Sequence, residues 1–306
     1  MKIMASIEST MFSPPPAKRR RISYQQYLGL PEPILYYLKK NANPKLQLKL
    51  MQTSKYFRFK EFPYMVVKEL KYDNNKWLYC KGKYSWNYTM LNLETLSKPL
   101  WITKGINCYT EDEKLVSRLL SKAAVCDIKN LRLEDQIISY NEFKLLISSG
   151  NIENVTFCYS HVEYENGQVV GIDEILKALP NVKQIRWLLD PETATTFTSE
   201  TTQKLINNLN PSMLQSFCIM NIPESFDFNL FTQFMTSNPS IDYFLDFDIL
   251  LSNQYSAILQ AYVDKIIATA STKYYPLHIR FPRQTENSIA CLQNLYKLYN
   301  QDDMKH

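Results

Sequence analysis

Short apolar segments alternate with amphipathic helical segments along the carboxyl-terminal two thirds of the chain. Six triplets read apolar–x–apolar, the spacing that places two side chains on one face of a β-strand: Leu131–Leu133, Val155–Phe157, Ile185–Trp187, Phe217–Ile219, Leu245–Phe247 and Ile279–Phe281. Between them, residues 141–147, 172–179, 201–209, 230–235 and 258–267 carry apolar side chains at helical spacing. The triplet centres lie 24 to 34 residues apart. A strand and a helix at this period predict stacked units that share one core.

The middle residue of each triplet is expected to point away from that core, on the concave face of the sheet. These residues would form one row: Arg132, Thr156, Arg186, Cys218, Asp246 and Arg280. Three arginines in one row indicate a binding surface for a partner protein, one that is acidic or phosphorylated. An ordinary solvated strand face is the alternative interpretation.

The region before residue 70 predicts three short helices. Pro31 and Pro33 suit a helix start, and Pro44 opens a second helix after the Asn43 cap. Thr53 or Ser54 can cap a third helix, which contains four aromatic residues between positions 56 and 62. Three short helices make a very small core, so the unit is expected to gain stability by docking on a partner or a neighbouring domain.

The pattern divides the chain into four segments. Residues 1–25 predict a disordered basic tail, because they are polar, contain three consecutive prolines and lack apolar periodicity. Residues 26–70 predict the helical module, residues 71–110 an aromatic-rich strand linker, and residues 111–306 the strand–helix repeat domain. Within the tail, Lys18, Arg19, Arg20 and Arg21 form a candidate nuclear-import signal, with a solubilising tail as the alternative.

Charge is distributed unevenly around the net value of +5. Residues 1–83 carry 17 basic and 5 acidic side chains, whereas residues 84–306 carry 18 basic and 25 acidic ones. An acidic partner for the amino-terminal segment explains this gradient better than a nucleic-acid-binding surface does. No apolar run is long enough for a membrane span, and no secretory signal is recognised.

Catalytic and cofactor motifs are absent from the sequence. The 6 glycines are scattered, so no dinucleotide- or phosphate-binding loop is predicted, and no cofactor is expected. The cysteines and histidines lack metal-ligand spacing. His161 lies among polar residues and is expected at the surface, while His278 precedes a predicted strand and is expected to be structural. The sequence therefore predicts a protein that is not an enzyme.

Residues 30–57 resemble an F-box, the module that docks substrate receptors onto the Skp-type adaptor of cullin–RING ubiquitin ligases. Leu30-Pro31 resembles its opening, and Pro44-Lys45-Leu46 its middle turn. Ser54-Lys55-Tyr56-Phe57 resembles its close, although Phe57 stands where tryptophan is commonest and Thr53 replaces the usual valine. The resemblance implies adaptor docking through Leu30, Pro31, Ile34, Leu38, Leu46 and Leu50. An ordinary helical subdomain is the alternative.

The strand–helix region resembles irregular leucine-rich repeats, without their regular leucine pattern. The expected fold is therefore α/β, a small three-helix module followed by a curved leucine-rich-repeat-like solenoid, with an ordinary α/β domain as the looser interpretation. The resemblance implies a cytoplasmic or nuclear receptor that presents a client protein for ubiquitylation, with a Skp-type adaptor and a cullin ligase as partners. An interaction scaffold with no ligase role is the second hypothesis.

Overall fold

The computed structural model describes residues 30–42, 44–54, 56–57, 64–80, 88–269 and 277–303. Its strands are β1 (Met65–Asp73), β2 (Lys76–Cys80), β3 (Tyr88–Leu91), β4 (Leu100–Tyr109), β5 (Ala123–Cys126), β6 (Asn130–Glu134), β7 (Ile137–Ser139), β8 (Asn154–Cys158), β9 (His161–Glu163), β10 (Gln184–Leu188), β11 (Ser216–Ile222), β12 (Asp242–Phe247) and β13 (His278–Arg280). Its helices are α1 (Glu32–Asn41), α2 (Pro44–Thr53), α3 (Leu115–Leu120), α4 (Tyr140–Ile147), α5 (Ile172–Lys177), α6 (Pro191–Thr195), α7 (Thr201–Asn208), α8 (Phe228–Ser237), α9 (Asn253–Ala268) and α10 (Glu286–Asp303).

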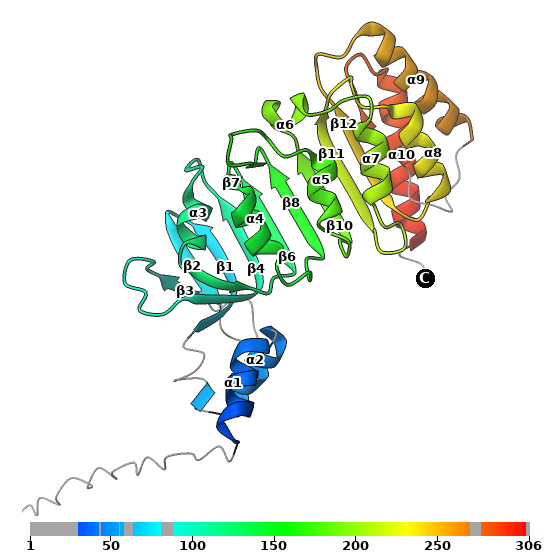
Figure 1. The fold of residues 1–306 in the computed structure, drawn as a ribbon. Coiled ribbons are helices and arrows are strands. Elements are labelled where there is room, and N and C mark those ends of the chain that lie inside the picture. The colour runs from blue at the N-terminus through cyan, green and yellow to red at the C-terminus, as the bar shows by residue number, and fades with distance from the viewer. Residues whose placement is uncertain are drawn as a thin grey trace, which may run out of the picture.

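One mixed, 11-stranded sheet organises the chain (Figure 1). Its order is β13-β12-β11-β10-β8-β6-β4-β1-β2-β3, with β5 paired to β4 beside this path. Neighbouring strands from β1 to β13 run parallel, and β2 and β3 extend the sheet as antiparallel strands. A separate two-stranded sheet joins β7 to β9.

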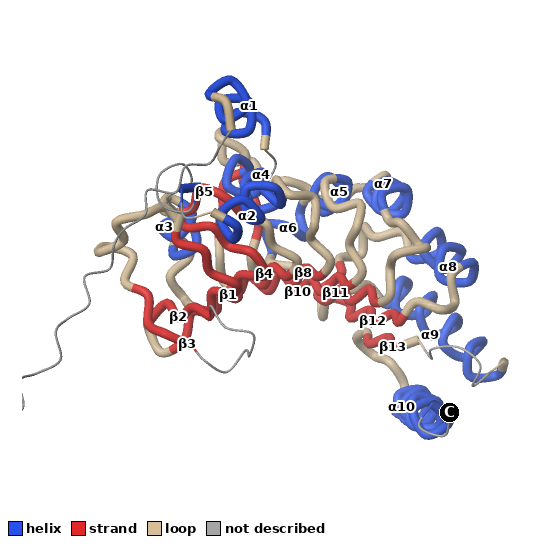
Figure 2. The backbone as a smooth tube through the Cα atoms, turned by 90° about the horizontal axis from the view of Figure 1, so that it is seen from below, coloured by secondary structure: helices blue, strands red, loops and turns tan. Residues whose placement is uncertain are grey.

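The main core lies between this sheet and the helices on one of its faces. Figure 2 shows α4, α5, α7 and α8 on the same side of the row of strands. The triplet residues that point to this side are buried, among them Leu131, Phe157, Trp187 and Phe217. The other face of β6 to β13 carries mostly polar side chains, and α10 borders it where the Tyr296 ring contacts His278, with centroids 4.1 Å apart. We call this face, from β6 to β13, the open face.

The predicted architecture of a three-helix module followed by a solenoid is wrong. The chain is an α/β protein whose main sheet is mixed and 11-stranded, and β1, β2 and β3 belong to that sheet. The connections between parallel strands are also unequal, because α6 and α7 both lie between β10 and β11 whereas α8 alone lies between β11 and β12. Among the described residues before position 64, the helices of more than one turn are α1 and α2. Residues 58–63 of the predicted third helix lie outside the described residues.

Candidate functional site

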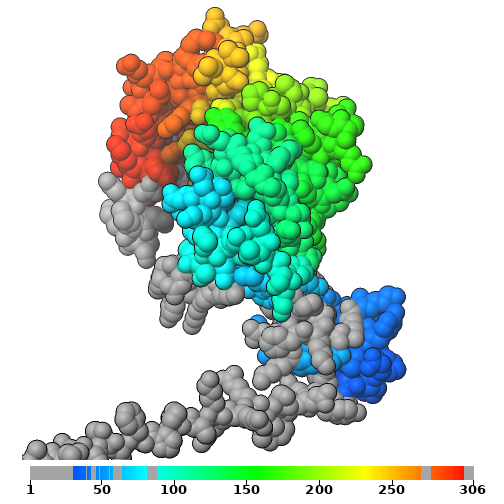
Figure 3. Space-filling model, turned by 90° about the vertical axis from the view of Figure 1, so that its left-hand side faces the viewer, coloured from blue at the N-terminus to red at the C-terminus, as the bar shows by residue number. Residues whose placement is uncertain are grey.

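Helices α1 and α2 are attached to the sheet by a small second core. This core consists of Leu35, Met51, Phe57 and Trp101, each no more than 7% exposed. Trp101 lies at the start of β4, and its ring meets Tyr64 edge-on with centroids 5.7 Å apart. Figure 1 shows the two helices below the sheet, and Figure 3 shows them projecting from the rest of the surface. A single tryptophan is therefore the main anchor that the sheet provides.

Proline and local hydrogen bonds set the limits of α1 and α2. Pro31 precedes α1 and Pro33 occupies its first turn, where proline is tolerated because the first N–H groups have no partner within a helix. At the end of α1, the Ala42 N–H donates to Leu38 O, and the Asn41 side chain donates to Tyr37 O. Thr53 donates its hydroxyl to Lys49 O at the end of α2. Residues within or next to each helix therefore set where α1 and α2 begin and end.

The residues predicted to dock an adaptor lie largely on the outer surface of these helices. Leu30, Ile34 and Leu46 are 40%, 47% and 38% exposed, and Pro31 is also exposed. Leu38 and Leu50 are half-buried against the Trp101 cluster. We call the group Leu30, Pro31, Ile34 and Leu46 the docking surface.

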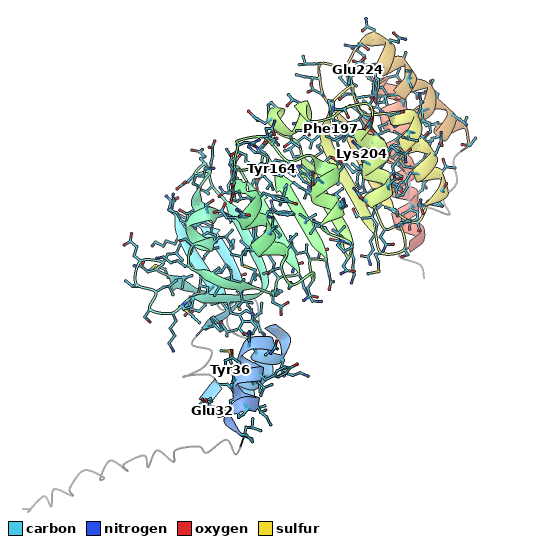
Figure 4. All side chains as sticks on the ribbon, in the orientation of Figure 1. Glu32, Tyr36, Tyr164, Phe197, Lys204 and Glu224 are labelled. Atoms are coloured by element: carbon cyan, nitrogen blue, oxygen red, sulfur yellow. The ribbon has the colours of Figure 1, made fainter. Side chains whose placement is uncertain are left out.

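Two tyrosines that the sequence interpretation did not single out enlarge the exposed aromatic and apolar area of α1. Tyr36 and Tyr37 are 63% and 65% exposed. Figure 4 labels Tyr36 on α1, below the sheet. Leu35 and Leu38 are the residues of α1 that pack against the Trp101 cluster, so the two tyrosines stay exposed.

Four of the six residues predicted for client binding lie in one register row. Arg132 pairs with Thr156, Thr156 with Arg186, and Arg186 with Cys218 on successive parallel strands. These strands are roughly 4.8 Å apart, so the two arginines flank Thr156 at a Cα separation of about 10 Å. Arg132 and Arg186 are exposed, and Thr156 and Cys218 are half-buried.

The row continues through different residues than predicted. Cys218 pairs with Phe244, and Phe244 with His278. Asp246 and Arg280 pair with each other, two residues further along β12 and β13. The predicted row of six is therefore wrong at its last two members, which share the open face but lie in the next row.

Burial controls the ionisation of several groups on the open face. It raises the pKa of Cys218 to about 11, although the Arg186 charge acts in the opposite direction. Burial also raises the pKa of Asp246, against the influence of Arg280. The Arg280 guanidinium lies 5.6 Å from the centre of the Phe244 ring. The face thus combines fixed cations with unreactive thiols and partly buried carboxyl groups.

A buried histidine cluster joins β9 to α6. His161 is 6% exposed; its Nδ1 contacts the Asp190 carboxylate, and its Nε2 lies 3.3 Å from Glu163 Oε1. Asp190 also caps α6 by accepting the Thr193 N–H at 2.8 Å. The expectation of a surface position for His161 was wrong, because Asp190, 29 residues later, covers its ring.

The hydrogen bond with Asp190 is the largest influence on His161 and raises its pKa, although burial opposes it. Burial is the largest influence on Asp190 and acts to raise its pKa, but the hydrogen bonds from His161 and Thr193 outweigh burial and lower it. The contact between the two side chains therefore favours the charged form of each. Ligand atoms of His161, Asp190 and Glu192 lie within 4.8 Å of one another, a set able to hold a divalent cation. Their mutual contacts equally account for a structural ion pair.

Comparison with known proteins does not assign the chain to a family. No family model matches it, and no curated protein sequence matches it. In the part of the chain that the structure describes, every helix is too short or too polar to cross a lipid bilayer.

Proposed function

We propose that the protein is a non-catalytic substrate receptor that docks on a Skp-type adaptor through α1 and α2. The observation that carries this proposal is the division of α1 into two faces. Leu35 is 7% exposed and faces the Trp101 cluster, whereas the neighbouring Ile34 is 47% exposed. The buried Leu35 that anchors the helix is thus distinct from the docking surface, whose four residues are exposed, whereas Leu38 and Leu50 pack partly against the Trp101 cluster.

The energetics of the module favour a partner. Each helix has 10 residues, a length at which an isolated helix is marginal in water. Covering Leu30 and Ile34 would remove further apolar area from water, at roughly 25 cal/mol per Å². The basic character of residues 1–83 would favour encounter with an acidic adaptor.

The open face of the sheet is the proposed binding surface for the client. It lies on a different element from the docking surface, so one chain could hold adaptor and client together. Transfer of ubiquitin would be performed by the partner enzymes. This role places the protein in the cytoplasm or nucleus, and the candidate import signal at 18–21 lies outside the described residues.

Co-purification with a Skp-type adaptor and a cullin tests the proposal. We expect the full chain to capture both, and Ile34→Asp to reduce adaptor capture at least roughly hundredfold, because a carboxylate would be buried against apolar groups. The pair Leu30→Ala with Pro31→Ala should also weaken capture. Ile249→Asp is the matched control, because Ile249 is 82% exposed in the connection between β12 and α9.

Undiminished capture by the Ile34→Asp variant would refute docking through α1. A full chain that binds neither adaptor nor cullin would instead favour the interaction scaffold with no ligase role. Circular dichroism and the unfolding midpoint of each variant should match those of the parent, since the substituted side chains are exposed.

A further inference from the structure

Two of the three arginines on the open face have a neighbour of opposite charge or an aromatic ring. Arg132 Nη2 lies 3.2 Å from Glu134 Oε2. Arg280 lies over the Phe244 ring, and its charge acts on the Asp246 carboxyl group. These contacts leave Arg132 and Arg280 partly neutralised by the face itself.

Arg186 is the exception. It is exposed at the centre of the row, and it makes no hydrogen bond or ion pair with any residue that the structure describes. The groups on which its charge acts are the thiols of Cys158 and Cys218, on the two neighbouring strands. Its guanidinium therefore lacks a carboxylate partner among the described residues, and its donors are available.

The surroundings of Arg186 restrict what it could bind. Thr156 and Cys218 flank it in the same row, and both are half-buried. In the next row, two residues or roughly 7 Å further along the strands, Leu188 and Met220 pair with each other and are half-buried. A planar guanidinium binds a carboxylate or phosphate through two parallel hydrogen bonds. The site therefore combines one oxyanion position with an apolar position beside it.

We propose, building on the proposed function, that Arg186 anchors an oxyanion of an extended peptide segment in the client, whose adjacent apolar residue lies on Leu188 and Met220. The oxyanion is a carboxylate or a phosphorylated hydroxyl, since the guanidinium fork accepts both. The segment crosses the strands of the open face, where none of the described strands or helices covers the middle of the row (Figure 2).

A protein segment fits this surface better than a nucleic acid does. Binding of a nucleic acid depends on several cations that neutralise successive phosphates. The open face offers one unneutralised arginine, and Glu134, Asp242 and Asp246 are carboxyl-bearing residues on the same face. These groups would oppose a polyanion but would tolerate a segment with a single charge.

Peptide selection on the immobilised full chain tests this site. The probe is a mixture of short degenerate peptides that contains glutamate, aspartate and phosphoserine at random positions. We expect the retained pool to be enriched in one acidic residue with an apolar residue close to it, and enrichment in glutamate or phosphoserine identifies the source of the oxyanion. For a single retained peptide, Arg186→Gln should weaken binding roughly tenfold to a hundredfold. Arg186→Lys should give a smaller loss, because it keeps the charge but lacks the fork.

Arg118→Gln is the matched control, because Arg118 is an exposed arginine on α3 that pairs with Asp112. It should leave peptide binding unchanged. A pool without acidic enrichment, or enrichment that survives Arg186→Gln, would overturn the inference. Binding of a labelled oligouridine that depends on Arg186, without acidic peptide enrichment, would overturn it in favour of nucleic acid.

Adaptor capture separates this inference from the proposed function. Arg186→Gln should capture a Skp-type adaptor as well as the parent chain does, and Ile34→Asp should keep the acidic peptides. Loss of peptide selection alone would thus leave adaptor docking intact, and loss of adaptor capture alone would leave the Arg186 site intact.

Discussion

Replacing Leu35 with alanine would test whether the Trp101 cluster holds α1 on the sheet. Leu35 is 7% exposed, and it is one of only four buried residues in that cluster. Leucine-to-alanine changes in cores cost about 2–5 kcal/mol. The cluster is small and lies at the amino-terminal end of β4, where neighbours can close part of the cavity. We therefore expect the lower end of that range, about 2–3 kcal/mol.

Amide hydrogen exchange measures this loss of stability in α1 itself, because a helix can unfold locally while the sheet stays folded. About 1.4 kcal/mol corresponds to a tenfold change in an equilibrium constant, so protection of the α1 amides should fall roughly 30-fold to 150-fold in Leu35→Ala. Ile34→Ala is the matched control on the neighbouring residue. Ile34 is 47% exposed, so its truncation should change stability by no more than about 0.5 kcal/mol, or about twofold in protection.

Amides of β8 provide the internal reference, because β8 contributes nothing to the Trp101 cluster. Equal loss of α1 protection in Leu35→Ala and Ile34→Ala would refute anchoring through Leu35, since the two faces of α1 would then contribute equally to the stability of the helix. Unchanged α1 protection in Leu35→Ala would show that the cluster does not stabilise the helix.

Two further predictions concern the sheet domain. The raised pKa of His161 means that its contribution to stability is complete below about pH 6.5, the unfolded value, and is lost as the pH rises through the folded value. In urea unfolding, the parent should therefore exceed the His161→Gln variant in free energy of unfolding by an amount that decreases as the pH rises. A difference that increases with pH would contradict the ion pair. At Gly105, a Cβ would lie 2.8 Å from Asn130 O, so Gly105→Ala should cost about 1–3 kcal/mol and lower the melting temperature. An unchanged melting temperature would show that β4 and β6 can separate at low cost.

The position of the strands could be predicted from local pattern, but their alignment could not. Each predicted triplet lies in or overlaps a strand of the structure, because alternation with a period of two decides which side chains face the core. In β12 the buried residues Tyr243, Leu245 and Phe247 offer two equivalent triplets. The two triplets show the same alternation of buried and outward residues. Only the pairing of β12 with β11 selects the register in which Phe244 lies opposite Cys218.

The architecture also depended on contacts that the local pattern does not contain. The aromatic segment before residue 110 predicted strands, but its pairing of β1 with β4 joins residues about 35 positions apart. The regular spacing of the triplets suggested structurally equal units. Spacing alone does not reveal that two helices, α6 and α7, lie in the connection between β10 and β11.

Local sequence is enough to predict which sheet residues face inward or outward and where α1 and α2 begin, because alternation and proline act within a few residues. It also supplied Arg186 and the exposed aliphatic residues of α1. The tertiary structure alone decided that Arg186 lacks a partner among the described residues while Arg132 has Glu134, and that Asp190 buries His161. Which neighbour meets a charge is fixed by chain segments brought together in space, and one segment of sequence does not contain that information.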